Sequence, residues 1–222
     1  MDDFVSIAAG GIENADRVRI TNGTIRMNEY YGQGGNLVSY PRINASFVNK
    51  VTDPTKFNPE ASFSAAFMIG SMGFVTDADG VENPNRYKVR GILPQYGGAV
   101  DVVDFYAVNP NVISAVSGGM WNEGDTVKIN GKLDFTSVVE EKEVPVDFGE
   151  PRIEKHTTTV SDLIITGGTQ PMEGDFALDA DEVKTALQNR QAHLDELKDK
   201  AKHKNAAKSA TPKKASFDDL GF

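Results

Sequence analysis

Tyrosines, one tryptophan and several lysines and arginines gather at three places in this sequence, and these residue types can hold a flexible anionic chain. Flat aromatic rings stack on unpaired bases, at about 1 to 3 kcal/mol per base, while cationic side chains neutralise the neighbouring phosphates. These residues therefore favour the binding of single-stranded nucleic acid. In chain order, the three groups are Tyr30, Tyr31, Tyr40 and Arg42; Arg86, Tyr87, Lys88 and Arg90; and Trp121, Lys128 and Lys132.

The second group has the most informative pattern, because it lies in a run of strictly alternating residues, RYKVRGIL, at positions 86–93. Successive side chains of a strand point to opposite faces, so Arg86, Lys88 and Arg90 share one face. We call these three residues the cationic stripe and expect it to contact phosphate. Tyr87 points to the other face, where it is either a core residue or a stacking platform.

The remaining candidates each have a purely structural alternative. A lone tryptophan in a β domain is more often buried than exposed, so Trp121 is either a core residue or a stacking platform. Lys128 and Lys132 alternate with apolar residues, and such lysines often form only a solvated face of a strand. The sequence leaves these alternatives open.

Strand patterns run through the first 170 residues and must position these groups. Two of them flank the glycine-rich loop at 32–36, and a bend or bulge is expected at Asn22-Gly23. Charged residues at 136–155 predict a long hairpin arm. In the strand before this arm, Val127, Ile129, Leu133 and Phe135 are expected to point inward. The predicted strands are 17–31, 40–51, 63–69, 86–93, 99–108, 125–135 and 156–166.

Helical patterns are few and lie late in the chain. One or two helical turns are expected near 111–116, closed by Gly118-Gly119. A charged helix follows from residue 180, with Asp179 or Asp181 as its N-cap. Its apolar stripe is narrow, so the helix docks, self-associates or is only partly formed. That stripe consists of Val183, Leu187, Leu194, Leu197 and Ala201.

Composition excludes several classes of function. The chain has 222 residues, a formal net charge of −9 and no cysteine, so disulfides, thiolate metal sites and cysteine nucleophiles are absent. Only His156 among the three histidines lies in the β-rich part, and no phosphate-binding glycine motif occurs. We expect no catalysis, no cofactor and no metal site. No apolar run is long enough for a membrane span, so we expect a cytoplasmic protein.

The last seven residues, SFDDLGF, combine two carboxylates with two large apolar side chains. A basic pocket with an apolar floor could bind such a segment. We therefore expect Asp218, Asp219, Leu220 and Phe222 to bind a partner protein. The expected organisation is a flexible N-terminal arm (1–16), a binding domain (17–170), a charged amphipathic helix (178–204), a basic linker (205–215) and this acidic tip (216–222).

The stretch from Asp101 to Phe135 resembles the bacterial single-stranded DNA-binding proteins. It has a strand, a short helix, a Gly-Asp turn and the V-x-I-x-G-x-L strand at 127–133, and residues 136–168 are similar to the hairpin and last strand of that family. The tip resembles the family's D-D-D-L-P-F ending, although Gly221 stands where the family has proline. Residues 52–98 would be an insertion, and the helix and basic linker have no counterpart. A diverged relative encoded by a bacteriophage fits these departures.

This resemblance implies a mainly β protein with an OB-fold, a five-stranded Greek-key barrel with insertions, followed by a C-terminal helix and a disordered tail. It also implies that the protein protects single-stranded DNA in replication, recombination and repair, in the bacterial cytoplasm, and recruits enzymes of those processes through the tip. The alternative is a β-rich structural or adaptor protein that self-assembles through its C-terminal helix. Oligomeric state and the choice between DNA and RNA stay open.

Overall fold

Five strands close into a barrel in the computed structural model, which describes residues 4–32, 34–57, 59–144 and 152–209. Around the barrel the strand order is β3-β4-β5-β7-β6, with β5 and β7 parallel and the other pairs antiparallel. The connection from β5 to β6 carries the helix α2. This is the OB-fold topology, as predicted. The strands are β3 (Ser62–Thr76), β4 (Glu82–Pro94), β5 (Val100–Ala107), β6 (Thr126–Val144) and β7 (Arg152–Gly168).

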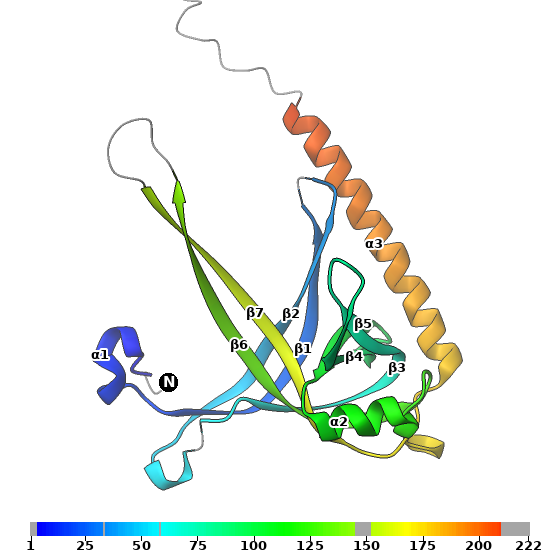
Figure 1. The fold of residues 1–222 in the computed structure, drawn as a ribbon, viewed down its shortest axis with the longest axis horizontal. Coiled ribbons are helices and arrows are strands. Elements are labelled where there is room, and N and C mark those ends of the chain that lie inside the picture. The colour runs from blue at the N-terminus through cyan, green and yellow to red at the C-terminus, as the bar shows by residue number, and fades with distance from the viewer. Residues whose placement is uncertain (1–3, 33, 58, 145–151, 210–222) are drawn as a thin grey trace, which may run out of the picture.

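The core of the barrel forms because alternate residues of each strand are apolar. Phe67 and Phe105 stack at its centre with their ring centroids 4.8 Å apart. They come from strands that are not neighbours, and Gly91 on the intervening β4 leaves room for both rings. Helix α2 (Pro110–Ala115) and the π-helical turn η2 (Val116–Met120) cover the lower end of the barrel in Figure 1. The short helix predicted near 111–116 is therefore confirmed.

The predicted insertion at residues 52–98 is wrong, because this region supplies the first two strands of the barrel, β3 and β4. Their apolar residues are needed to close the core. The addition lies earlier in the chain: β1 (Val18–Tyr31) and β2 (Leu37–Lys50) form a separate two-stranded sheet. Its register shifts around Asn22, where a bulge was expected. Figure 1 shows this hairpin, the arm formed by β6 and β7, and α3 all extending upward from the barrel.

The arm formed by β6 and β7 confirms the predicted long hairpin, since their pairing runs without a further register shift from Gly131 to Val144, which lies opposite Arg152. One residue at its root departs from expectation. Phe135 was expected to point inward but is 57% exposed. The register shifts between Asn130 and Gly131, and beyond Leu133 the strand leaves the barrel for the arm, where no core remains to cover the ring.

The N-terminal arm was expected to be loose, but residues Ile7–Asn14 form a short helix, α1. The side chain of Ser6 accepts a hydrogen bond from the backbone N–H of Ala9 and so caps the helix. Gly11 breaks its regular geometry with φ +72°. A second short turn, η1 (Pro54–Lys56), lies between the hairpin and the barrel.

The C-terminal helix α3 (Ala180–Ser209) follows the short turn η3 (Gly174–Phe176). Asp179 caps it, as predicted, by accepting hydrogen bonds from the N–H groups of residues 181 and 182. Val183 and Ala186 pack on Met68, Ile92 and Val100 of the barrel. The helix is longer than predicted and includes the start of the predicted basic linker. The rest of the linker and the tip lie outside the described residues.

The close approach at Gly91 generates a stability prediction. A Cβ atom there would lie 2.6 Å from Cδ2 of Phe67 and 2.9 Å from Cε2 of Phe105. Overpacking of this kind costs about 1 to 3 kcal/mol, so Gly91→Ala should lower the free energy of unfolding by that amount. Gly73→Ala is the matched control, because a Cβ at Gly73 meets no atom within 4 Å. Urea denaturation measures both, and equal stabilities would contradict this account of the core.

Candidate nucleic-acid interface

The cationic stripe lies on the outer surface of β4, as the alternation predicts, but its two arginines are already paired. Arg86 donates from Nη2 to Oδ2 of Asp162 at 2.8 Å, and its guanidinium carbon lies 4.0 Å from the centre of the Tyr106 ring. Arg90 donates two hydrogen bonds to Asp104, at 2.7 and 2.9 Å. These bonds raise the pKa of Arg90 above its ordinary value.

Lys88, between the two arginines, has no ion pair or hydrogen bond from its side chain within the described ranges. It stands opposite Gly73 on one neighbouring strand and Tyr106 on the other. Tyr106 was missed by the sequence analysis, although the alternation of β5 places it outward with Val102 and Asp104. Burial raises the pKa of its hydroxyl. The stripe therefore offers one unpaired cation next to a partly exposed ring.

Tyr87 and Trp121 belong to the core, which removes both from the candidate surface. Tyr87 is 9% exposed and meets the Phe74 ring edge-on, with 4.9 Å between the centroids. Trp121 is 2% exposed, and its indole N–H donates to the carbonyl oxygen of Thr169 at 2.8 Å. Rings buried to this extent have no free face on which a base could stack.

Lys128 and Lys132 lie on the outer surface of β6, which is separated from β4 by β3. The structure therefore does not bring them together with the cationic stripe. Lys132 pairs with Glu60 at 2.9 Å, whereas the side chain of Lys128 is exposed and has no partner among the residues that the structure describes.

The hairpin formed by β1 and β2 has two different faces. Ile25, Met27 and Ile43 pack against the core of the barrel, and on the same face Glu29 and Ser39 line a cleft. Cross-strand partners share a face, and neighbours along a strand alternate. The opposite face, which we call the outer hairpin face, therefore carries three registered pairs: Arg26 with Arg42, Asn28 with Tyr40, and Tyr30 with Val38.

The outer hairpin face joins three of the four residues of the first predicted group. Tyr30 and Tyr40 are 46% and 45% exposed, and Arg42 is exposed with no partner among the described side chains. Tyr31 is opposite Leu37 on the inner face and so does not join them. Residues 18–50 contain four cations and one acid, Glu29, in a chain whose net charge is −9. Arg26 on this face pairs with Asp101, so the outer hairpin face offers one uncompensated cation, Arg42, beside two tyrosines.

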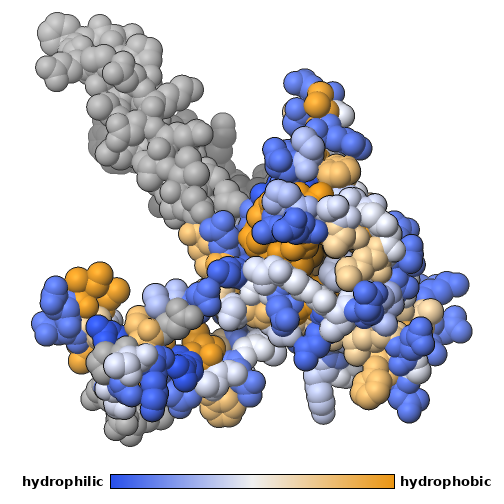
Figure 2. Space-filling view, turned by 60° about the horizontal axis from the view of Figure 1, so that its bottom comes forward, coloured by the Kyte–Doolittle hydropathy of each residue, from blue (hydrophilic) through white to orange (hydrophobic). Residues whose placement is uncertain are grey.

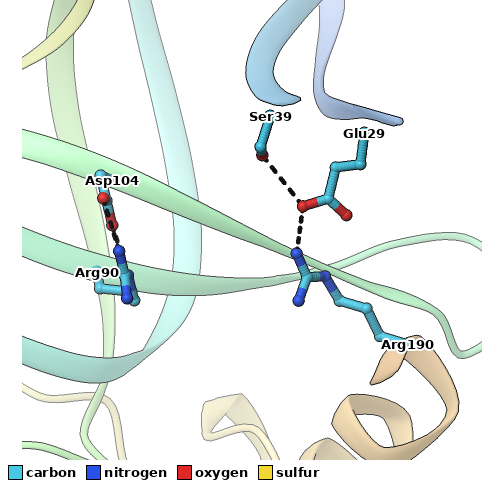
Figure 3. Close-up of polar contacts among 5 residues, drawn as sticks. All are labelled: Glu29, Ser39, Arg90, Asp104 and Arg190. Atoms are coloured by element: carbon cyan, nitrogen blue, oxygen red, sulfur yellow. Dashed lines mark hydrogen bonds and ion pairs between the residues drawn. The ribbon is translucent and has the colours of Figure 1, made fainter. Parts of the chain in front are cut away.

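A cleft of about 430 Å³ separates the inner face of the hairpin from β5 and α3. Figure 3 shows Glu29 in this cleft, bonded both to Arg190 of α3 and, at 3.1 Å, to the hydroxyl of Ser39, with the Arg90–Asp104 pair nearby. Because its arginines face carboxylates of the same chain, the cleft attracts phosphate less than an unpaired basic groove would.

Four charged residues meet where the hairpin, β5 and α3 come together: Arg26, Glu29, Asp101 and Arg190. We call them the junction cluster. Nε of Arg26 lies 3.2 Å from Oδ2 of Asp101, and Arg190 bonds to Glu29. Burial raises the pKa of the Asp101 carboxyl, against the lowering effect of its hydrogen bond from the Met27 N–H and of Arg26. The junction cluster thus links three elements through charge.

Apolar side chains are also exposed, but at the opposite, open end of the hairpin. Ile20 and Phe47 near that end, and Ile7 and Ile12 of α1, are all more than half exposed. Figure 2 shows orange side chains on the N-terminal lobe at the left, set apart from the body of the molecule. This apolar surface is separate from the outer hairpin face, whose tyrosines lie toward the closed end.

Two other classes of site are absent from the described residues. No group of three or more His, Asp or Glu side chains is close enough there to hold a metal ion. No helix in the same ranges has the length and apolar character needed to cross a membrane.

Comparison with solved structures finds proteins that are similar to about half of this chain. The mitochondrial single-stranded DNA-binding protein Rim1 of S. cerevisiae is similar at 12% identity over 52% of this chain and 99% of that chain, with a TM-score of 0.33. A small single-stranded DNA-binding protein of Streptomyces coelicolor is similar at 17% identity over 52% and 95%, with a TM-score of 0.30. At 12% and 17% identity, the likeness carries no information on what this chain binds.

Among curated proteins no sequence match is found. The model of one protein family, described as YorF, matches residues 1–200, which is most of the sequence. The chain therefore belongs to the YorF family.

Proposed function

We propose that this protein binds single-stranded DNA with little sequence specificity, and that the outer hairpin face makes the main contact. The observation that carries the proposal is the combination on that face of two half-exposed tyrosines with an unpaired arginine, Arg42, and no carboxylate in the registered pairs. Tyrosine rings stack on any base, and arginine neutralises phosphate without reading sequence. Duplex DNA keeps its bases stacked inside, so this surface suits single strands.

Electrostatics favours the outer hairpin face over the cationic stripe as the first point of contact. A phosphate that approaches Arg86 or Arg90 meets the carboxylate of Asp162 or Asp104 as well. Lys88 is the member of the stripe that offers an uncompensated charge. The β4 and β5 surface corresponds to the second and third strands of an OB-fold, the usual place for an oligonucleotide. We infer that Lys88 makes a second phosphate contact.

The self-assembling adaptor is the less favoured alternative. Its mechanism needs a free apolar stripe on α3. Val183, Ala186 and Leu194 are buried within a single chain, with Val183 and Ala186 packed against the barrel. The helix therefore uses this stripe to dock. We propose binding without catalysis, in the bacterial cytoplasm during replication, recombination and repair. The viral origin that the resemblance implies stays a prediction.

The outer hairpin face generates the first binding prediction. Tyr40→Ala combined with Arg42→Ala should weaken binding of labelled oligothymidine about tenfold or more, since one stacked base alone contributes about 1 to 3 kcal/mol. Loss of one phosphate contact should also reduce the slope of log affinity against log salt by about 0.7. Fluorescence anisotropy at several salt concentrations measures both quantities.

The matched control removes one exposed ring and one exposed cation elsewhere, through Phe176→Ala with Lys200→Ala. Phe176 is 76% exposed, and Lys200 lies on α3 in an exposed pair with Glu196. Thermal unfolding of both double variants shows that they are folded. If the hairpin and control variants bind oligothymidine equally well, the outer hairpin face is not the contact.

Lys88 and Lys128 allow a second test, because they lie on different sides of the barrel and neither side chain has a partner among the described residues. Lys88→Ala should reduce the salt slope by about 0.7, whereas Lys128→Ala should leave it unchanged. The measurement is again anisotropy across a salt series. The reverse outcome would move the path of the strand to the outer surface of β6, where Lys128 and Lys132 lie.

We also propose that the tip recruits replication or repair enzymes, which rests on its residues and on the resemblance. A basic pocket would pair with Asp218 and Asp219, and its apolar floor would take Leu220 and Phe222. Deletion of residues 216–222 should leave affinity for DNA unchanged or slightly higher, because an acidic segment competes with phosphate. It should abolish co-precipitation of purified host replication enzymes, and Phe222→Ala should do the same. Retained co-precipitation would disprove the role of the tip.

A further inference from the structure

We infer that Arg190 of α3 is a positioning residue. It fixes the half of the β1–β2 hairpin next to the closed end, so that the docking of α3 sets the affinity for DNA. The inference rests on the proposed function, since it concerns the surface proposed to hold the strand. It assigns to the C-terminal helix a role in regulating a site formed near the N-terminus.

The hairpin needs an external support, because an isolated pair of strands is at best marginally stable in water. Near its middle, Ile25, Met27 and Ile43 provide that support by packing on the core. Toward the closed end, the inward positions are Glu29, Ser39, Tyr31 and Leu37, and the first two with Leu37 line the cleft instead of a packed core. This is the half of the hairpin that carries Tyr30 and Tyr40.

Arg190 supplies the missing support from α3. Its Nη2 donates to Oε1 of Glu29, and the side chains of Arg190 and Glu29 are only 20% and 12% exposed. A charge-assisted hydrogen bond in such a position is stronger than an exposed ion pair. In Figure 3 the bond spans the space between the helix and the hairpin.

The face of α3 that docks on the barrel continues to the hairpin. Val183 and Ala186 pack on the barrel, Arg190 reaches Glu29, and Leu194 is buried one turn later. These positions are three or four residues apart and therefore lie along one side of the helix. Movement of the helix off the barrel would necessarily withdraw Arg190 from the hairpin.

The junction cluster allows the hairpin and α3 to separate, because some of its polar atoms lack hydrogen-bond partners. Among the described residues, the buried Nε of Arg190 has no hydrogen-bond partner, and the buried Oδ2 of Asp101 has only its ion pair with Arg26. Unsatisfied buried groups reduce the net stability that a charged cluster provides. The hairpin and α3 are thus coupled by the pair of Glu29 and Arg190, which lies outside the hydrophobic core of the barrel.

A charge-reversal cycle tests this inference. Glu29→Arg and Arg190→Glu each place two like charges side by side. The double variant restores an ion pair, with the positive charge on the hairpin and the negative charge on α3. Each single variant should accelerate amide hydrogen exchange in the hairpin around residues 28–40 and weaken oligothymidine binding about tenfold, the size expected when one charge-assisted hydrogen bond is lost. The double variant should restore both properties toward wild type.

The matched control reverses an exposed pair farther along the same helix, Glu196 and Lys200, which are 3.7 Å apart. Glu196→Lys and Lys200→Glu carry comparable changes of charge but should leave hairpin exchange and affinity unchanged. Rescue by the double variant distinguishes positioning from a direct effect of charge on DNA.

The outcomes separate this inference from the proposed function. If wild type binds oligothymidine and the single variants match it in exchange and affinity, the positioning role of Arg190 is wrong and the proposed function stands. If wild type does not bind oligothymidine, the proposed function fails. The exchange measurement, which needs no DNA, then still decides whether Arg190 holds the hairpin.

Discussion

The stacking of Phe67 on Phe105 across Gly91 is the contact on which the rest of the structure depends. The rings come from the first and third strands of the barrel, so their approach requires a residue without a side chain on the strand between them. Once this centre is closed, the outer surfaces of β4 and β5 have a fixed curvature and their side chains a fixed register. The hairpin and α3 pack against the barrel that this centre closes.

Charge pairing explains how an acidic protein can present a basic surface. On the barrel, Arg86 and Arg90 are matched by Asp162 and Asp104, so that these cations stabilise the protein more than they attract a ligand. The hairpin differs because its one acid, Glu29, is turned inward to Arg190. The separation of charge between the two faces of a two-stranded sheet leaves Arg42 free on the outside.

The sequence predicted those features of the fold that depend on the local pattern of residues. Alternation placed Arg86, Lys88 and Arg90 on one face, and the family resemblance of residues 101–168 implied the OB-fold. It could not distinguish barrel strands from the hairpin strands, since both alternate, and so residues 52–98 were wrongly taken for an insertion. The partner of Arg90 depends on which strands become neighbours: Asp104 is directly opposite it across β4 and β5. The role of Arg190 was equally hidden, because a charged residue on a charged helix carries no local signal.

The bond between Glu29 and Arg190 joins residues 161 positions apart, which ties the beginning of the chain to its end. Contacts so distant in sequence form late, because the intervening chain must be ordered first. During synthesis, the hairpin leaves the ribosome long before α3 does. With the role inferred for Arg190, its tyrosines reach their final position only when the barrel is complete and the helix has docked, so a nascent or truncated chain lacks the finished outer hairpin face.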